Sequence, residues 1–203
     1  MPRHSSNVKP KQQGQLRIIA GQWRGRKLSF PEVDGLRPTG DRLRETLFNW
    51  LQQDLHQAHC LDLFAGSGSL GLEALSRGAS HCTFIDASKL VCQSLTENLT
   101  RLDCRSGQVV QQDAVFWLQQ SASTLAQESE RKPYDLIFCD PPFALDLWDE
   151  VIHAVNAHPL IAANARVYVE TPKNQTVQIP DNWHLHRSKD AGQVSVCLYN
   201  RTV

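Results

Sequence analysis

The strongest constraint on the fold is an alternation of short apolar runs with amphipathic segments. Strands are expected at 60–64, 82–86, 108–112, 135–140 and 165–170, and helices between them at 69–77, 89–102, 114–127 and from about 146 to 157. In the second of these helices, for example, Leu95, Leu99 and Leu102 fall on one face. Strictly alternating strands and helices predict a parallel, doubly wound sheet with right-handed crossovers.

The end of the chain departs from this pattern. The segments "WHLHRSK" (183–189) and "VSVCLYN" (194–200) flank "DAGQ", and no helix fits between them. Two strands joined by so short a loop predict an antiparallel hairpin. The predicted fold is therefore α/β, with a mostly parallel seven-stranded sheet that ends in an antiparallel hairpin.

The first 54 residues predict a small extension ahead of this sheet. Residues 16–30 alternate apolar and basic side chains around two glycines, which is typical of a hairpin. A helix is expected to begin after Pro38, with Thr39 or Asp41 as its N-cap. One face of this helix carries Leu43, Leu47, Trp50 and Leu51. We thus expect a flexible basic tail at 1–15, an extension at 16–54 and the main domain at 55–203.

Charge is distributed unevenly along a chain whose formal net charge is zero. Residues 1–50 hold ten Lys or Arg and four Asp or Glu, whereas residues 51–203 hold eleven basic and seventeen acidic residues. A basic segment beside an acidic body suggests a polyanionic partner that binds one end of the molecule. Charge alone fits a solvated tail equally well.

Composition narrows the class of protein. The 203 residues contain no apolar run near the ~18 that cross a bilayer, and the N-terminus lacks the apolar core of a signal peptide. The six cysteines form no C-x-x-C pair and the histidines are scattered, so reduced, packed thiols and no metal site are expected. We expect a cytoplasmic protein, monomeric, without metal and without membrane contact.

A glycine-rich loop follows the first strand of the main domain. Gly66, Gly68 and Gly71 spell G-x-G-x-x-G, and Asp86 lies 20 residues beyond Gly66 at the tip of the second strand. Such a loop lets an adenosine-containing ligand approach bare backbone amides, and the acidic residue accepts its ribose hydroxyls. The motif fits either NAD or S-adenosylmethionine, and a tight turn without ligand is the third interpretation.

Two further carboxylates bear on the identity of the ligand. Asp62 lies inside the first strand, where a buried carboxylate needs a partner that a ligand ammonium would supply. Asp113 ends the third strand, within reach of an adenine amino group. That position suits a helix N-cap equally well, so both roles of Asp113 stay open.

The tetrapeptide Asp140-Pro141-Pro142-Phe143 ends the fourth strand. The first and fourth strands usually flank the topological switch point, so this loop is expected to face the cofactor. Two prolines remove amide donors and leave carbonyls, the Asp140 carboxylate and the Phe143 ring. Acceptors beside a ring suit a planar amino group, whose N–H bonds they hold so that its lone pair can attack a methyl group.

These motifs together resemble a known family. "DLFAGSG", Asp86, Asp113 and "DPPF" are similar to the class I S-adenosylmethionine-dependent methyltransferases that act on planar amino nitrogens. The segments "RIIAGQWRGRKL", "LRPTGDRLRETLFNWL" and "LDLFAGSGSLGLEALSRGA" closely resemble the bacterial RsmD family, which methylates N2 of a guanine in 16S ribosomal RNA. The resemblance extends from about Gln15 to "AGQVSVCLY" near the end.

The resemblance implies a Rossmann-like fold and a role for each matching residue. S-adenosylmethionine would contact the glycine loop and the strand ends, at Asp62, Phe64, Ala65, Gly66, Ser67, Gly68, Asp86, Asp113 and Ala114. The target base would be held by Asp140, Pro141, Pro142 and Phe143. The 16S RNA of the small subunit would contact the extension at Arg17, Arg24, Arg26, Lys27, Arg37, Thr39 and Arg42. Gly71 is then a helix–strand packing position.

Two alternatives belong to other classes. Another amino-nitrogen methyltransferase, acting on DNA adenine or cytosine or on protein glutamine, would use the same tetrapeptide. A non-catalytic RNA-binding assembly factor could keep the fold, although it would need neither the intact glycine loop nor the intact Asp140-Pro-Pro-Phe143.

Overall fold

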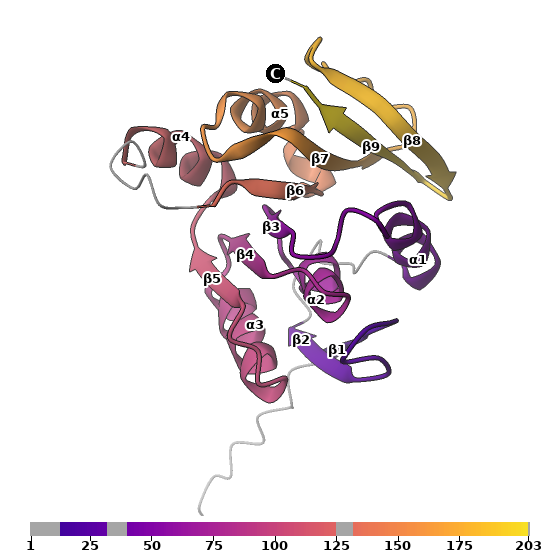
Figure 1. The fold of residues 1–203 in the computed structure, drawn as a ribbon, viewed down its shortest axis with the longest axis vertical. Helices are drawn as coiled ribbons and strands as arrows, with labels where there is room; N and C mark the ends of the chain where they lie inside the picture. The colour runs from indigo at the N-terminus through magenta and orange to yellow at the C-terminus, as the bar shows by residue number, and fades with distance from the viewer. Residues whose placement is uncertain (1–12, 32–39, 125–131, 203) are drawn as a thin grey trace, which may run out of the picture.

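The computed structural model describes residues 13–31, 40–124 and 132–202. Its main feature is a seven-stranded sheet with the order β5-β4-β3-β6-β7-β9-β8 (Figure 1). Neighbouring strands from β5 to β7 run parallel, and β9 runs antiparallel to both β7 and β8. The strands are β3 (His59–Asp62), β4 (His81–Asp86), β5 (Gly107–Gln111), β6 (Tyr134–Cys139), β7 (Ile161–Pro172), β8 (Trp183–Ala191) and β9 (Val194–Arg201). The predicted fold class is confirmed.

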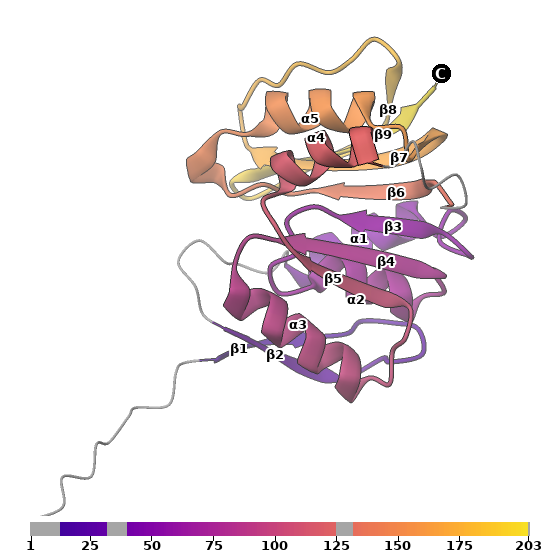
Figure 2. The same ribbon diagram turned by 90° about the vertical axis from the view of Figure 1, so that its left-hand side faces the viewer.

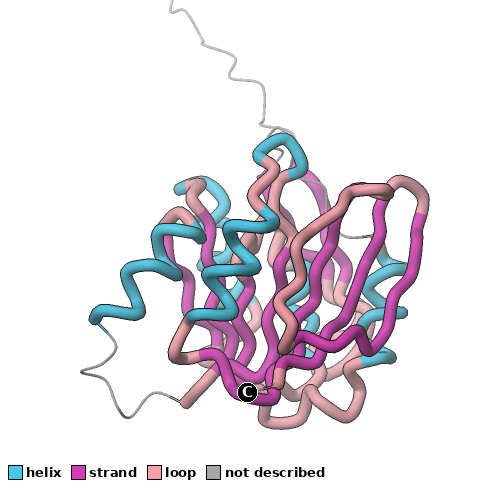
Figure 3. The backbone as a smooth tube through the Cα atoms, turned by 90° about the horizontal axis from the view of Figure 1, so that it is seen from above, coloured by secondary structure: helices cyan, strands magenta, loops and turns pink. Residues whose placement is uncertain are grey.

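Helices cover both faces of this sheet (Figures 2 and 3). One face packs against α1 (Asp41–Trp50), α2 (Ser69–Ser76) and α3 (Lys89–Arg101), and the other against α4 (Ala114–Thr124) and α5 (Trp148–Ala157). Strand residues divide between the two cores by strict alternation, since Phe84 and Phe138 face the first core while their neighbours Ile85 and Ile137 face the second. Burial of both faces explains why these strands are almost continuously apolar.

Most element boundaries lie within one or two residues of those expected, and the larger differences include the start of the N-terminal hairpin and the start of β7. This strand begins at Ile161, four residues earlier than its apolar pattern indicates, and its register against β6 shifts between Tyr134 and Leu136. The added residues, "IAAN", carry little strand signal of their own. Ile161 pairs with Tyr134, and the three residues after it lie within the register shift.

The N-terminal hairpin forms a separate two-stranded sheet. Its strands β1 (Gln13–Arg17) and β2 (Lys27–Pro31) are antiparallel, and β1 begins three residues before the expected start of the hairpin. The backbone carbonyl of Ser29 in β2 accepts hydrogen bonds from Asn98 Nδ2 at 2.8 Å and from Ser94 Oγ at 3.0 Å. The hairpin therefore rests on α3, as Figure 2 shows.

A buried carboxylate on α2 ties this extension to the main domain. Glu73 is fully buried, and its two oxygens accept the backbone N–H groups of Ile19 and Ala20, each at 2.9 Å. Arg77 Nε donates to the same carboxylate at 2.7 Å, and Arg44 Nη1 lies 3.8 Å from it. The loop of the hairpin and the helix α1 thus meet on one acidic side chain.

Arg44 is one of the ten basic residues of the first fifty, yet it is fully buried. Its Nη2 donates to Asp41 Oδ1 at 2.7 Å and to the Arg17 carbonyl at 2.9 Å. One of the basic residues near the N-terminus, Arg44, is therefore structural and adds nothing to a basic surface. Asp41 is the first residue of α1 rather than its N-cap, because Gly40 takes the cap position without a side-chain bond. The alternative cap, Thr39, lies outside the described residues.

The described residues offer neither a membrane span nor a metal cluster. Within 13–31, 40–124 and 132–202, no helix has the length and apolar character to cross a bilayer. Over the same ranges, no three His, Cys, Asp or Glu side chains come together as metal ligands. All six cysteines are free thiols.

Replacing Glu73 by Gln tests the buried ion pair. The change leaves the Arg44 and Arg77 guanidiniums without their shared counter-charge, and removing one partner of a buried pair is strongly destabilising. We expect the free energy of unfolding in urea to fall by about 3 kcal/mol. The matched control is Glu45→Gln on the exposed face of α1, expected within about 0.5 kcal/mol of wild type. Equal effects of the two variants would contradict the role assigned to Glu73.

Candidate active site

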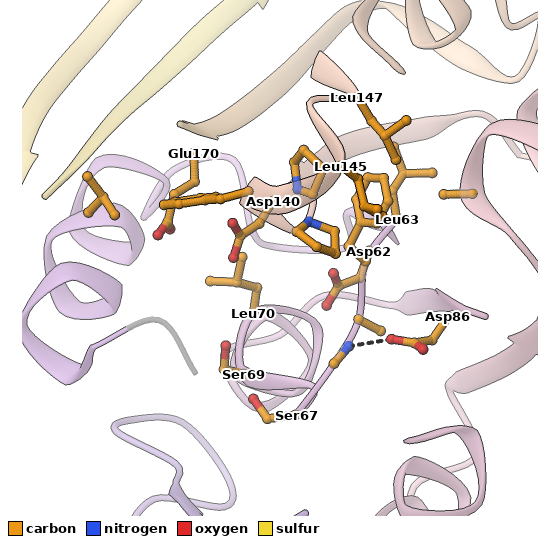
Figure 4. Close-up of a pocket in the computed structure, with 18 of the residues that line it drawn as sticks. Asp62, Leu63, Ser67, Ser69, Leu70, Asp86, Asp140, Leu145, Leu147 and Glu170 are labelled. Carbon is orange, nitrogen blue, oxygen red and sulfur yellow. Dashed lines mark hydrogen bonds between the residues drawn. The ribbon is translucent and has the colours of Figure 1, made fainter. Parts of the chain in front are cut away.

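A large cavity opens at the carboxyl ends of β3, β4 and β6 (Figure 4). Its volume is about 1150 Å³, and it is closed on one side by Gly40 and the first residues of α1 and on another by the β8–β9 turn. Single small-molecule sites measure roughly 300–1,000 Å³, so this cavity has room for a cofactor and part of a second ligand. It lies where β3 and β6 pair, at the switch point expected from the sequence.

The glycine loop forms the floor of the cavity, but its glycines differ in role. Gly66 (φ 51°) lines the cavity, and Gly68 (φ 77°) does not. Gly68 instead caps α2 in a left-handed conformation, where a Cβ would lie 2.6 Å from Leu95 Cδ2. A Cβ on Gly71 would clash with the Phe84 ring, which explains this glycine by packing. The structure thus gives Gly68 a turn-forming role, in place of the expected position in the cavity wall.

Asp62 is buried beneath this loop. Its Oδ2 accepts the Gly71 N–H at 3.0 Å, a free amide of the first turn of α2. Burial raises the pKa of Asp62 to about 7, a rise that the Gly71 bond opposes and the Asp86 charge increases. Among the described residues, the Gly71 N–H is the one hydrogen-bond donor to Asp62, and a cationic ligand would stabilise its charged form further.

The next two strand ends each bring a carboxylate to the cavity. Asp86 Oδ2 accepts the Gly66 N–H at 3.0 Å, the dashed line of Figure 4, and Oδ1 accepts the Ser88 N–H at 2.8 Å. Each oxygen keeps a lone pair for a ligand. Asp113 Oδ1 accepts the Phe116 N–H at 2.9 Å, so Asp113 caps α4. Asp113 and Ala114 also line the cavity, which leaves a ligand contact compatible with the cap.

The tetrapeptide forms the opposite wall. All four of its residues line the cavity, and the chain continues into a short 3-10 helix (Phe143–Leu145). Burial, then the charges of Glu170 and Asp62, raise the pKa of Asp140 well above its usual range. The Phe143 ring is 42% exposed and packs at 5.7 Å against the buried ring of Trp148, so one face remains open to a ligand.

Two charged residues of the cavity were not predicted from the sequence. Glu170 of β7 is 7% exposed and lines the cavity beside Asp140. Lys189 of β8 lies at the rim, where its Nζ donates to Thr46 Oγ1 at 2.9 Å. The signal for Glu170 was available, since it is the one acidic residue in the apolar run "ARVYVE", just as Asp62 is in "CLDLF".

The cavity is predominantly acidic. Among its lining residues, Arg42 and Lys189 are basic and both derive from elements at the rim. The acidic lining residues are Asp41, Asp62, Asp86, Asp113, Asp140 and Glu170. Such a lining favours a ligand with positive charge and opposes a polyanionic one.

The candidate RNA-binding residues lie on the N-terminal extension. Arg17, Arg24, Arg26 and Lys27 are exposed on the hairpin, and Arg42 is exposed at the cavity rim. Arg37 and Thr39 lie outside the described residues. The exposed basic side chains of the hairpin lie outside the cavity lining, whereas Arg42 of the same extension belongs to it.

Comparison with known proteins places the chain in a family. The family model described as "Conserved hypothetical protein 95" matches residues 16–200. The chain is 46% identical to the ribosomal RNA small subunit methyltransferase D of Escherichia coli K12, over 98% of this chain and 94% of the relative. The identity is also 46% to the protein of that name from Haemophilus influenzae, over 94% and 96%. The solved structure of yhhF from Escherichia coli superposes with a TM-score of 0.83 at 44% identity, covering 94% of this chain and 99% of that one. The chain therefore belongs to the RsmD family, the ribosomal RNA small subunit methyltransferases D.

Proposed function

We propose that the protein transfers a methyl group from S-adenosylmethionine to N2 of a guanine in 16S ribosomal RNA. The observation that carries this proposal is the end of β6, where Asp140, Pro141 and Phe143 line the same cavity as the glycine loop. The names of the relatives support a small-subunit RNA substrate and a methyl transfer.

The acidic lining supports S-adenosylmethionine over NAD. NAD would bring an anionic pyrophosphate next to Asp62 and Asp140, whereas S-adenosylmethionine carries an ammonium and a sulfonium. Asp62 would hold the ammonium, the first-turn amides of α2 the carboxylate, and Asp86 the ribose hydroxyls. Asp113 and Ala114 would border the adenine. When bound, this cofactor supplies an electrophilic methyl group on sulfur.

The tetrapeptide would prepare the amine for attack. An exocyclic amine shares its lone pair with the aromatic ring and is a weak nucleophile. Hydrogen bonds from its two N–H groups to Asp140 and the Pro141 carbonyl favour a pyramidal nitrogen whose lone pair points at the methyl group. Stacking on the exposed Phe143 ring would fix the base, and Trp148 supports that ring from behind. As the N–C bond forms and the bond between the methyl carbon and the cofactor sulfur breaks, the amine becomes acidic, so Asp140 can accept its proton without being a strong base.

The RNA would dock through the extension. A guanine must leave its stack to reach Phe143, so the target nucleotide is flipped or already looped out. The exposed side chains of Arg17, Arg24, Arg26 and Lys27 suit phosphate contacts, and affinity should then fall steeply with salt. Arg42 and Lys189 at the rim suit the phosphates that flank the flipped nucleotide.

The direct test is to identify the methylated nucleoside. The protein is incubated with methyl-labelled S-adenosylmethionine and unmethylated small subunits, naked 16S RNA or DNA, and the nucleic acid is digested. We expect label in N2-methylguanine and in no other nucleoside. Label in N6-methyladenine or N4-methylcytosine would support the alternative amino-nitrogen methyltransferases. Cofactor binding without transfer to any of these substrates would favour the non-catalytic assembly factor.

Replacing Asp140 by Ala separates chemistry from cofactor binding. The variant removes one acceptor of the amine while leaving the contacts to the glycine loop intact. We expect kcat to fall by about 100-fold to 1,000-fold and the Kd for S-adenosylhomocysteine to change by less than about threefold. Asp181→Ala, at an exposed position outside the cavity, is the matched control. Full activity of the Asp140 variant would reject the assigned role.

Replacing Asp62 by Asn tests the cost of the buried carboxylate. Its pKa is about 7 in the folded chain against an ordinary 3.8, so wild-type stability declines as pH rises from about 4 to about 7. Asn keeps the acceptor for Gly71 without the charge. Without ligand, the variant should gain about 2 kcal/mol in unfolding free energy relative to wild type between pH 5 and pH 8. Its Kd for S-adenosylhomocysteine should rise at least about tenfold.

Urea unfolding at the two pH values and calorimetric titration provide these measurements. A stability difference between the variant and wild type that is the same at pH 5 and pH 8 would show that Asp62 ionises normally.

A further inference from the structure

Glu170 is a buried carboxylate that the proposed methyl transfer leaves without a role. It lies on β7 opposite the end of β6, because Cys139 pairs with Val169 and the next residues along the two strands are Asp140 and Glu170. Both side chains line the cavity, and Figure 4 shows their carboxylates next to each other. The Glu170 charge is also among the causes that raise the pKa of Asp140, which confirms their proximity.

The Glu170 carboxylate is oriented by a second buried group. The hydroxyl of Tyr168, fully buried, donates to Glu170 Oε2 at 2.7 Å. No hydrogen bond formed by the described residues uses Glu170 Oε1, although the residue is only 7% exposed. Glu170 Oε1 is not among the fully enclosed side-chain atoms without a partner, so this oxygen is accessible from the cavity, where it can accept a hydrogen bond from a ligand.

The chemistry of the bases identifies that donor. Guanine carries N1–H directly beside its N2 amino group, so two adjacent positions on its edge donate hydrogen bonds. Adenine and cytosine also carry an amino group, but the neighbouring ring nitrogen has a lone pair and no hydrogen. If Asp140 accepts a hydrogen bond from the amino group, the adjacent ring nitrogen of the base lies beside the neighbouring acceptor of the cavity wall, Glu170.

We infer that Glu170, held in place by the Tyr168 hydroxyl, accepts a hydrogen bond from N1–H of the target base and thereby selects guanine. The inference rests on the proposed guanine-N2 activity and names the residue that reads the base. Adenine or cytosine in the same position would turn a ring lone pair toward the Glu170 carboxylate. The ring nitrogen and the carboxylate are both acceptors, so they would repel each other and neither would receive a hydrogen bond. Sites that require a hydrogen-bond donor on the substrate discriminate strongly against analogues without it.

The test uses small subunits reconstituted with either guanine or 2,6-diaminopurine at the methylated position. The analogue keeps the 2-amino group and lacks the N1 hydrogen. We expect wild-type protein to prefer guanine by about 100-fold or more in kcat/KM. Glu170→Gln can place an amide N–H opposite the bare ring nitrogen, so it should lower activity on guanine at least tenfold and shrink the preference at least tenfold.

Controls separate this role from a structural one. The Glu170 backbone carbonyl accepts the Trp148 Nε1–H at 2.7 Å, and the substitution leaves that bond in place. The Kd of Glu170→Gln for S-adenosylhomocysteine should stay within about threefold of wild type. Glu150→Gln, on the exposed surface of α5, is the matched control and should keep the wild-type preference. Tyr168→Phe removes the orienting hydroxyl and should also reduce the preference, so it decides the matter if Glu170→Gln does not fold.

The outcomes distinguish a failure of the role assigned to Glu170 from a failure of the proposed activity. If wild type methylates guanine N2 and both variants keep the full preference for guanine, the role of Glu170 is wrong while the activity stands. If wild type methylates neither substrate, the proposed activity itself fails.

Discussion

The molecule is organised around the buried carboxylate of Glu73. This side chain receives two backbone amides of the hairpin loop and two guanidinium groups, so it joins the extension, α1 and α2 at a single point. The α2 helix that carries Glu73 begins at the glycine loop, and α1 supplies residues 41–43 of the cavity wall. Arg77 compensates part of this buried charge, and the extension supplies the two backbone amides and Arg44 that compensate the rest. The extension carries the candidate RNA-binding residues, and its docking also completes the cavity wall.

The carboxylates of the cavity, unlike Glu73, have few hydrogen-bond partners among the described residues. Parallel strands bring their carboxyl ends to one edge, so Asp62, Asp140 and Glu170 are held close together with few protein donors. Burial raises the pKa of each of them, which means that the folded chain without ligand carries an electrostatic cost. A cationic cofactor and a base rich in N–H donors would offset that cost.

Local pattern predicted the architecture and a large part of the cavity, for a physical reason. Strand ends in a parallel sheet meet at one edge, so Asp62, Asp86, Asp113 and Asp140 could be placed together without knowing any contact. An acidic residue in an apolar strand marked Glu170 as unusual, but its position beside Asp140 depends on the register of β7 against β6, which shifts near Tyr134 and is not given by local pattern. Arg44 looked like a surface cation, since burial of an arginine depends on a partner, Glu73, that lies 29 positions away.

The central claim is that the carboxylates at the strand ends serve methylation of one guanine in 16S RNA. The most direct measurement is mass spectrometry of 16S RNA from cells that lack this gene and are complemented with wild type or with Asp140→Ala. The account predicts that one N2-methylguanine disappears in the deletion strain, returns with wild type and stays absent with the variant. An unchanged set of N2-methylguanines in the deletion strain, or full restoration by the variant, would contradict it.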